Sequence, residues 1–115
     1  MENLAKVKCE PCRIGAPQLT SEQISEYNQI IPEWVVVQDE HVNKLERYFK
    51  TKDYTTTIKF VNAIAEIANS EDHHPVLLAE FSSVTVWWWT HKIKGLHLND
   101  FIMAAKTDEI FNSRF

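Results

Sequence analysis

The pattern of apolar and polar positions predicts an irregular start followed by regular elements. Residues 1–18 show no period and contain two prolines and a glycine, so we expect an irregular N-terminal arm. Thr20 opens a capping box, and apolar residues then recur every three or four positions until Pro32, which cannot extend a helix. The pattern therefore predicts an ordered domain over 19–115 that begins with a helix ending near Ile30.

The rest of the chain alternates between runs typical of strands and runs typical of helices. The predicted strands cover residues 34–37, 45–49, 76–81 and 84–91, as two hairpins. Between the hairpins, Asp53 is a good N-cap for a long helix whose apolar positions repeat as far as Ala68. A last apolar stripe predicts a closing helix from Leu98 to about Ile110. The order is helix, two strands, helix, two strands, helix.

This order predicts an α+β fold with two layers, in which a mostly antiparallel four-stranded sheet carries helices on one face. The run Trp87-Trp88-Trp89 adds a constraint, because successive strand residues point to opposite faces and both faces would then carry tryptophan. The second face should therefore be covered. Core packing or a subunit interface is favoured for most of the triplet, with a flat aromatic ligand as the alternative.

Composition and charge narrow the class of protein. A chain of 115 residues with 44% hydrophobic residues can bury the core of one domain. Its formal charge of -4 argues against nucleic acid as a partner. No apolar stretch is long enough to cross a bilayer and no secretory signal precedes the domain, so a cytoplasmic location is expected. There Cys9 and Cys12 should stay reduced, and this lone CxxC is better explained by ordinary thiols than by a zinc or redox site.

Three of the five histidines fall where catalytic groups often occur, at the ends of predicted elements. His73 and His74 follow the long helix, and His91 lies at the end of the last predicted strand. Histidine can donate and accept a proton near neutral pH, so three together would suit proton transfer. By strand parity His91 would share a face with Trp87 and Trp89, in a water-poor pocket. The competing interpretation is that polar loops collect histidines by chance.

A metal site is the other alternative for these histidines. Adjacent residues in an extended segment point to opposite sides, so His73 and His74 cannot easily bind one ion. The chain offers no HxH or HxxxH pair and no third thiolate. Acid/base chemistry without a metal is therefore favoured.

Two further residues have a structural and a functional interpretation. Trp34 could form a pocket wall, although core filling is the more common role of a tryptophan. Asp100 could take part in the site or could simply stabilise the N-terminus of the last helix as a carboxylate. For both residues the structural role is favoured on these grounds alone.

An ordered set of motifs resembles the pterin-4a-carbinolamine dehydratases over roughly residues 34–109. The motifs are Asp72-His73-His74-Pro75, Thr90-His91, Gly95-Leu96 and Asn99-Asp100. The chain looks closest to the bacterial members associated with phenylalanine hydroxylase, and the early Cys9-Glu-Pro-Cys12 also fits these members. His-His-Pro alone is a weak signal, whereas the ordered set is specific.

The resemblance implies a role for each matched residue. His73 and His74 correspond to the paired catalytic histidines, His91 to the third, and Asp100 to a supporting carboxylate counted with the substrate-binding residues. Trp34 corresponds to a tryptophan beside the pterin pocket. Asn69 stands where some members carry a glutamate, so this chain has no carboxylate to act at that position. His97 replaces the serine or threonine that often caps the last helix, which should weaken that cap.

The resemblance also implies the activity. Residues 19–115 are expected to form a single pterin dehydratase domain, a 4a-hydroxytetrahydrobiopterin dehydratase that acts as a hydro-lyase without metal or cofactor. The substrate would be a 4a-hydroxytetrahydropterin, and the reaction would recycle the cofactor of phenylalanine hydroxylase, the expected functional partner. We expect a homodimer or homotetramer. The alternative is a non-catalytic binding or dimerisation module that regulates the hydroxylase or its expression.

Overall fold

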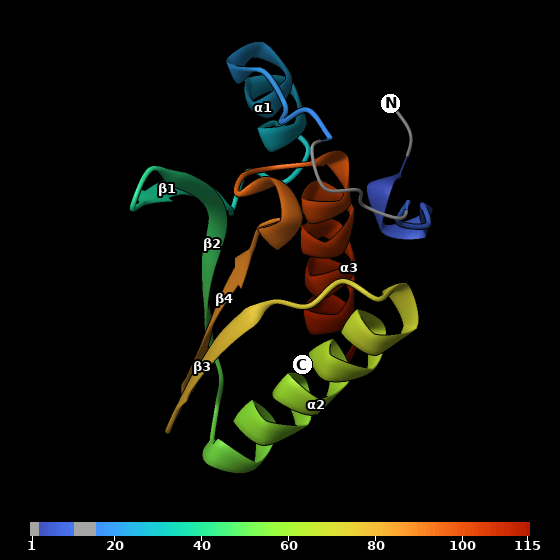
Figure 1. Ribbon diagram of the computed structural model, residues 1–115. Helices are drawn as coiled ribbons and strands as arrows, with labels where there is room; N and C mark the ends of the chain where they lie inside the picture. Colours follow the sequence, from blue (N-terminus) through green and yellow to red (C-terminus); the bar gives the residue numbers. More distant parts are fainter. Residues whose placement is uncertain (1–2, 11–15) are drawn as a thin grey trace.

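The computed structural model describes residues 3–10 and 16–115, and within these ranges the chain forms one four-stranded sheet with helices against one face (Figure 1). The helices are η1 (Leu4–Lys6), α1 (Ser21–Asn28), α2 (Tyr54–Glu71), η2 (His91–Ile93) and α3 (Leu98–Arg114), and the strands are β1 (Val35–Asp39), β2 (Val42–Lys50), β3 (Val76–Glu80) and β4 (Ser83–Trp88). The predicted α+β class and order of the main elements are confirmed. Among the described helices, none is both long and apolar enough to span a membrane.

The sheet has the strand order β1-β2-β4-β3, and each neighbouring pair is antiparallel. The two predicted hairpins are β1–β2 and β3–β4, and β4 joins them by pairing with β2. Because α2 connects β2 to β3 across one face, the second hairpin returns beside the first with β3 at the edge. The start of β3 and the end of α2 therefore lie close to the middle strands.

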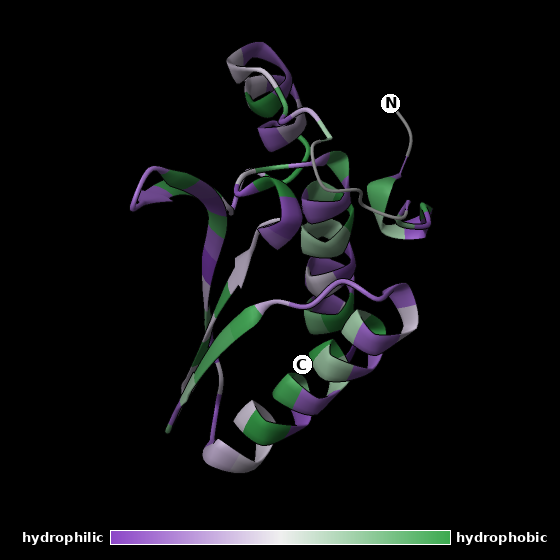
Figure 2. Cartoon of the chain, in the orientation of Figure 1, coloured by the Kyte–Doolittle hydropathy of each residue, from purple (hydrophilic) through white to green (hydrophobic). Residues whose placement is uncertain are grey.

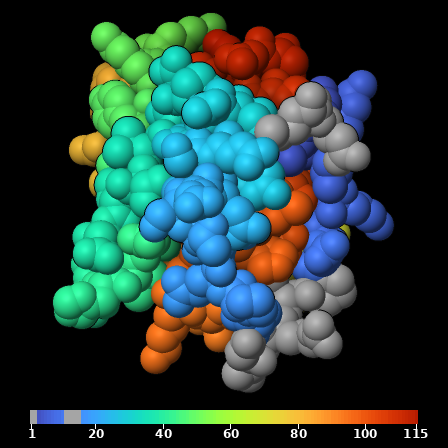
Figure 3. All heavy atoms as spheres, turned by 90° about the horizontal axis from the view of Figure 1, so that it is seen from above, coloured from blue at the N-terminus to red at the C-terminus, as the bar shows by residue number. Residues whose placement is uncertain are grey.

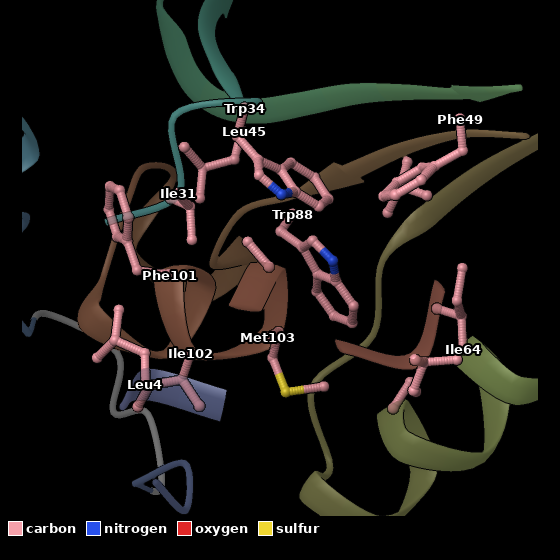
Figure 4. Packing of buried hydrophobic residues seen from close by; sticks show 14 of the residues in the cluster. Leu4, Ile31, Trp34, Leu45, Phe49, Ile64, Trp88, Phe101, Ile102 and Met103 are labelled. Atoms are coloured by element: carbon pink, nitrogen blue, oxygen red, sulfur yellow. The ribbon is translucent and has the colours of Figure 1, made fainter. Parts of the chain in front are cut away.

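The core lies between the sheet and the helices α2 and α3. Apolar positions of α2 at four-residue spacing, Phe60, Ile64 and Ala68, are all buried, as the amphipathic pattern predicts. Figure 2 shows the corresponding alternation of apolar and polar bands along α2. Figure 4 shows Trp34 and Trp88 reaching into the same core as Met103 of α3. Both helices are therefore held on the sheet by side chains from the two middle strands and from the chain before β1.

The last strand is shorter than predicted. β4 ends at Trp88, and His91 lies in the turn of η2 instead of on the strand. Thr90 makes an isolated antiparallel bridge with Gly95, and Lys94 adopts a left-handed conformation with φ of 52°, so the chain curls back before α3. The strand-parity argument for His91 was therefore wrong in its premise, because parity holds only within a continuous strand.

The outer face of the sheet carries apolar side chains that the chain itself leaves uncovered. The register aligns Val35, Glu46, Trp87 and Val76 in one row across all four strands. Val35 and Val76 are 58% and 43% exposed, whereas Trp88 on the opposite face is fully buried. Trp87 and Trp88 therefore lie on opposite faces, as predicted, whereas Trp89 lies beyond the end of β4. The described residues supply no cover for the outer face.

The N-terminal arm is more ordered than the pattern suggested. Residues Leu4–Lys6 form the short helix η1, and Leu4 is buried beside Ile102 of α3 (Figure 4). Figure 3 shows the dark-blue N-terminal segment lying along the orange segment that begins α3. A single turn is too short to show a helical period, so only the contact with α3 reveals it. Cys12 falls outside the described residues.

Candidate active site

The three predicted histidines line one cavity of about 310 Å³. It lies where the end of α2, the turn η2, the start of α3 and the N-terminal segment meet. The lining residues are Cys9, Glu10, Glu71, Asp72, His73, His74, Thr90, His91, Lys92 and Asn99. The volume is at the lower end of the range of small-molecule sites. Polar and titratable side chains therefore converge on a space of ligand size.

The end of α2 places the paired histidines. The helix stops at Glu71, and Asp72 adopts a left-handed conformation with φ of 50° while its N–H bonds to the carbonyl of Ala68. This residue reverses the chain, as left-handed residues at helix ends commonly do. His73 is then buried and His74 is exposed, in accord with the prediction that the two neighbours point apart.

His73 is held on two sides. Its Nε2 lies 2.6 Å from Oδ1 of Asp100, and its ring stacks on Trp88 at a centroid distance of 5.7 Å and an interplanar angle of 8°. With Nε2 engaged by the carboxylate, Nδ1 is the ring nitrogen that remains for a ligand. The arrangement can therefore present a proton donor or acceptor in a fixed direction.

Asp100 lies behind His73 and does not line the cavity. Its side chain is fully buried, and Oδ2 accepts hydrogen bonds from Thr90 Oγ1 at 2.8 Å and from the His97 N–H at 2.9 Å. The carboxylate thus caps the first turn of α3 and is also hydrogen-bonded to His73 from behind the cavity.

His97 caps α3, contrary to the expected weakening. Its Nδ1 accepts a hydrogen bond from the Asn99 N–H at 3.0 Å, and Asp100 closes the capping box from the other direction. An unprotonated imidazole nitrogen is an acceptor like a serine hydroxyl, so the substitution preserves the cap.

The other two predicted site histidines, His74 and His91, are oriented by neighbours outside the core. His74 Nε2 lies 3.0 Å from Oδ1 of Asn69, the residue that replaces a glutamate of some relatives. His91 stacks on Trp89 at 4.3 Å, and the Lys44 ammonium lies 4.1 Å from the centre of that indole. Both rings therefore reach the cavity with a defined orientation.

The surroundings of His91 favour its neutral form. Partial burial lowers the pKa of His91 from 6.5, and the charges of His73, Lys44 and His74 lower it further, against an opposite effect of Asp100. A neutral imidazole accepts a proton, so His91 can act as a base near neutral pH.

Trp34 is not part of this cavity. It is 1% exposed, and its indole N–H donates to Oδ1 of Asp108 at 2.8 Å, beside the ion pair of Asp108 with Arg47. Burial raises the pKa of Asp108 despite these partners. The structure therefore places Trp34 in the core, in the role that its residue type favours, and does not bring it to the histidines.

Several lining residues were not predicted as site residues. Glu71 and Asp72 both reach the cavity, because α2 ends at Glu71 and the left-handed Asp72 reverses the chain there. Cys9 and Glu10 belong to the segment expected to be irregular, and their part in the resemblance to bacterial members was the available signal. In the described parts of the chain, no three His, Cys, Asp or Glu side chains are grouped so that they could hold a metal ion.

Comparisons with known proteins agree with this geometry. Residues 17–110 match the family model described as pterin 4 alpha carbinolamine dehydratase. A protein of Nitrosococcus oceani, named as a candidate pterin-4-alpha-carbinolamine dehydratase, is 44% identical over 110 residues, which cover 96% of this chain and 97% of that protein. The crystal structure of a transcriptional coactivator/pterin dehydratase from Brucella melitensis superimposes with a TM-score of 0.74 at 29% identity, covering 82% of this chain and 98% of that one. The chain therefore belongs to the pterin-4a-carbinolamine dehydratase family, a family of hydro-lyases.

Proposed function

We propose that this protein dehydrates a 4a-hydroxytetrahydropterin to the quinonoid dihydropterin by histidine acid/base catalysis. The observation that carries the proposal is the convergence of His73, His74 and His91 on one cavity, with His73 tied to the buried carboxylate of Asp100. Family membership supports the substrate class. The reaction would return the cofactor of phenylalanine hydroxylase to its cycle, which makes that enzyme the functional partner.

The chemistry requires two proton transfers around one ring. The C4a–O bond breaks and its electron pair leaves with oxygen, which takes a proton from protonated His73 and departs as water. The N5–H proton passes to neutral His91, and its electron pair forms the C4a=N5 double bond. Solvent then returns the proton from His91 to His73. General acid/base assistance of this kind accelerates a reaction by about 10²- to 10⁴-fold.

The three histidines have different environments that match different roles. His73 is buried and its Nε2 is held by the Asp100 carboxylate, so its ring has one fixed orientation in which to donate a proton. His91 has a lowered pKa and suits a base. His74 is exposed and held by Asn69, so it is placed to bind or orient the pterin.

A decay assay tests the proposal. The 4a-carbinolamine is generated by a hydroxylase, and its ultraviolet decay is followed without protein and with wild type, His73→Ala or His91→Ala. His41→Asn is the matched control, because His41 lies in the exposed β1–β2 turn with φ of 68°, which asparagine tolerates. We expect acceleration by wild type and the control and its loss in the two site variants. Equal decay in all samples would remove the enzymatic role and favour the binding module.

We also propose that two copies of the chain associate through the outer sheet face as part of a homodimer or homotetramer. Val35, Tyr48, Val76 and Leu78 leave 43–62% of their surface exposed there. Contiguous apolar surface of this kind favours association. Sedimentation of wild type and Leu78→Lys tests it, because a charge at this face should shift the wild-type assembly toward monomer. A monomeric wild type would contradict the assembly.

A binding role has one observation in its favour, the description of the Brucella melitensis protein as a coactivator as well as a dehydratase. The outer sheet face is the surface available for such a role. Loss of self-association in Leu78→Lys with retained dehydration would separate this surface from the catalytic cavity.

A further inference from the structure

One wall of the cavity comes from a segment that precedes the region matched by the family. The family match begins at residue 17, yet Cys9 and Glu10 line the same cavity as the three histidines. The segment 3–10 lies along the start of α3 (Figures 1 and 3). The segment therefore lines the cavity without contributing any of the three histidines, which all come from the domain that follows.

The segment is fastened along its length. Leu4 is 5% exposed in the core, and the carbonyl of Ala5 accepts a hydrogen bond from Lys106 Nζ at 2.7 Å. Closer to the cavity, the Cys9 N–H donates to Oε1 of Glu71 at 2.8 Å. The anchors come from the middle of α3 and from the end of α2, so the segment bridges the two helices that frame the site.

The backbone of Glu10 is held by two hydrogen bonds. The buried side chain of Asn99 accepts a hydrogen bond from the Glu10 N–H at 2.9 Å and donates one to the Glu10 carbonyl at 2.6 Å. This reciprocal pair fixes the backbone of Glu10 in the manner of a β-bridge. The residue itself is exposed and lines the cavity, and within the described parts of the chain its carboxylate has no fixing partner comparable to that of its backbone.

Three carboxylates line the cavity, and they are not equivalent. Glu71 and Asp72 directly precede the paired histidines in the chain and therefore belong to the histidine wall. Oε1 of Glu71 already accepts the Cys9 N–H. Glu10 alone among the three comes from the N-terminal segment, so it is the carboxylate suited to the edge of a ligand that does not face the histidines.

A pterin has such an edge. The histidines act at C4a and N5, in the ring that undergoes dehydration. The pyrimidine ring presents two adjacent donors, the N3–H and the 2-amino group, which match the two oxygens of a carboxylate as a bidentate pair. Resting on the proposed function, we infer that Glu10 binds this N3–H/2-amino edge and makes the N-terminal segment a specificity-determining wall of the pterin site.

The test uses binding as well as turnover. The ligands are 7,8-dihydropterin and the corresponding 2-oxo compound, in which an acceptor replaces the 2-amino donor. Tryptophan fluorescence or calorimetry gives Kd for wild type, for Glu10→Gln and for the control Glu22→Gln on the exposed first turn of α1. A charged hydrogen bond at a partly solvated site favours the 2-amino ligand by about 10-fold.

The expected result is a preference for the 2-amino ligand in wild type and Glu22→Gln that is lost in Glu10→Gln. In the decay assay, Glu10→Gln should raise KM by a similar factor of about 10 and leave kcat within about twofold. A purely structural role for Glu10 would not remove discrimination between two ligands that differ only at C2 and in the proton on N1.

The two ways to fail are distinct. If wild type binds the 2-amino ligand selectively and Glu10→Gln does so equally, the inference about Glu10 is wrong and the proposed function stands. If wild type neither binds dihydropterin nor accelerates dehydration, the proposed function fails and the inference falls with it.

Discussion

Replacing Asp100 by asparagine is the sharpest probe of the site, because it changes charge and hydrogen-bonding pattern with almost no change in shape. The carboxylate accepts three hydrogen bonds, from His73 on Oδ1 and from Thr90 and His97 on Oδ2. An asparagine has one acceptor oxygen, which will accept the hydrogen bonds from Thr90 and His97 in place of Oδ2. Its NH2 group then faces His73 Nε2, so that nitrogen must become an acceptor and the proton moves to Nδ1.

Two magnitudes follow for Asp100→Asn. Loss of one charge-assisted hydrogen bond in a buried site costs about 1.5–3 kcal/mol of unfolding free energy. For a domain of this length each kcal/mol corresponds to roughly 4 °C, so Tm should fall by roughly 6–12 °C. The tautomer of His73 is reversed, which moves its proton to the other ring nitrogen, so the catalysed rate should fall by about 10²- to 10⁴-fold.

The assay is the decay of the 4a-carbinolamine at a temperature well below the Tm of every variant. Thr90→Val is the matched control, because it removes a donor to the same carboxylate without altering the charge beside His73. We expect the control to retain most of the rate. If Asp100→Asn remains folded and as active as wild type, the carboxylate does not position His73 for catalysis and the proposed mechanism is refuted.

Three further predictions address other parts of the molecule. The pKa of His91, measured by NMR, should lie below 6.5, so the free energy of unfolding should fall as the pH drops through the unfolded-state pKa. Asp100→Asn should lower the pKa of His91 further, and an unshifted pKa in wild type would contradict the argument. Trp34→Phe should cost about 1–3 kcal/mol through the lost bond to Asp108 and the lost volume, without changing the rate per folded molecule, and a selective loss of activity would return Trp34 to the site. Thr20→Ala should cost about 1 kcal/mol in urea unfolding by removing the capping box of α1, and an unchanged midpoint would show that the cap contributes nothing.

The regular elements were predictable because each has a local signal. Asp53 accepts the Thr56 N–H at 2.8 Å and starts α2 where a capping residue precedes a long amphipathic run. The end of β4 was not predictable, because Trp89 and Thr90 have the residue types of a strand. What ends the strand is the bridge from Thr90 to Gly95, a contact formed only once the chain has curled back.

The candidate site was predictable in part. The three histidines stood out by their place at element ends, and the resemblance to a family joined them to Asp100. The same resemblance placed Trp34 beside the pocket. A core tryptophan and a pocket tryptophan cannot be distinguished by sequence pattern alone. Glu10 lay in a stretch without period, where no local pattern reports a contact with α3.

The amino-acid sequence by itself determined the order of helices and strands and the placement of histidines at their ends, since capping, periodicity and β-branching act between near neighbours. Only the tertiary structure decided which of these ends meet. The backbone N–H of Cys9 donates a hydrogen bond to Glu71, 62 positions away, and the ring of His73 is hydrogen-bonded to Asp100, 27 positions away. Such pairs depend on how the helices pack on the sheet, and a pattern between near neighbours carries no information about them.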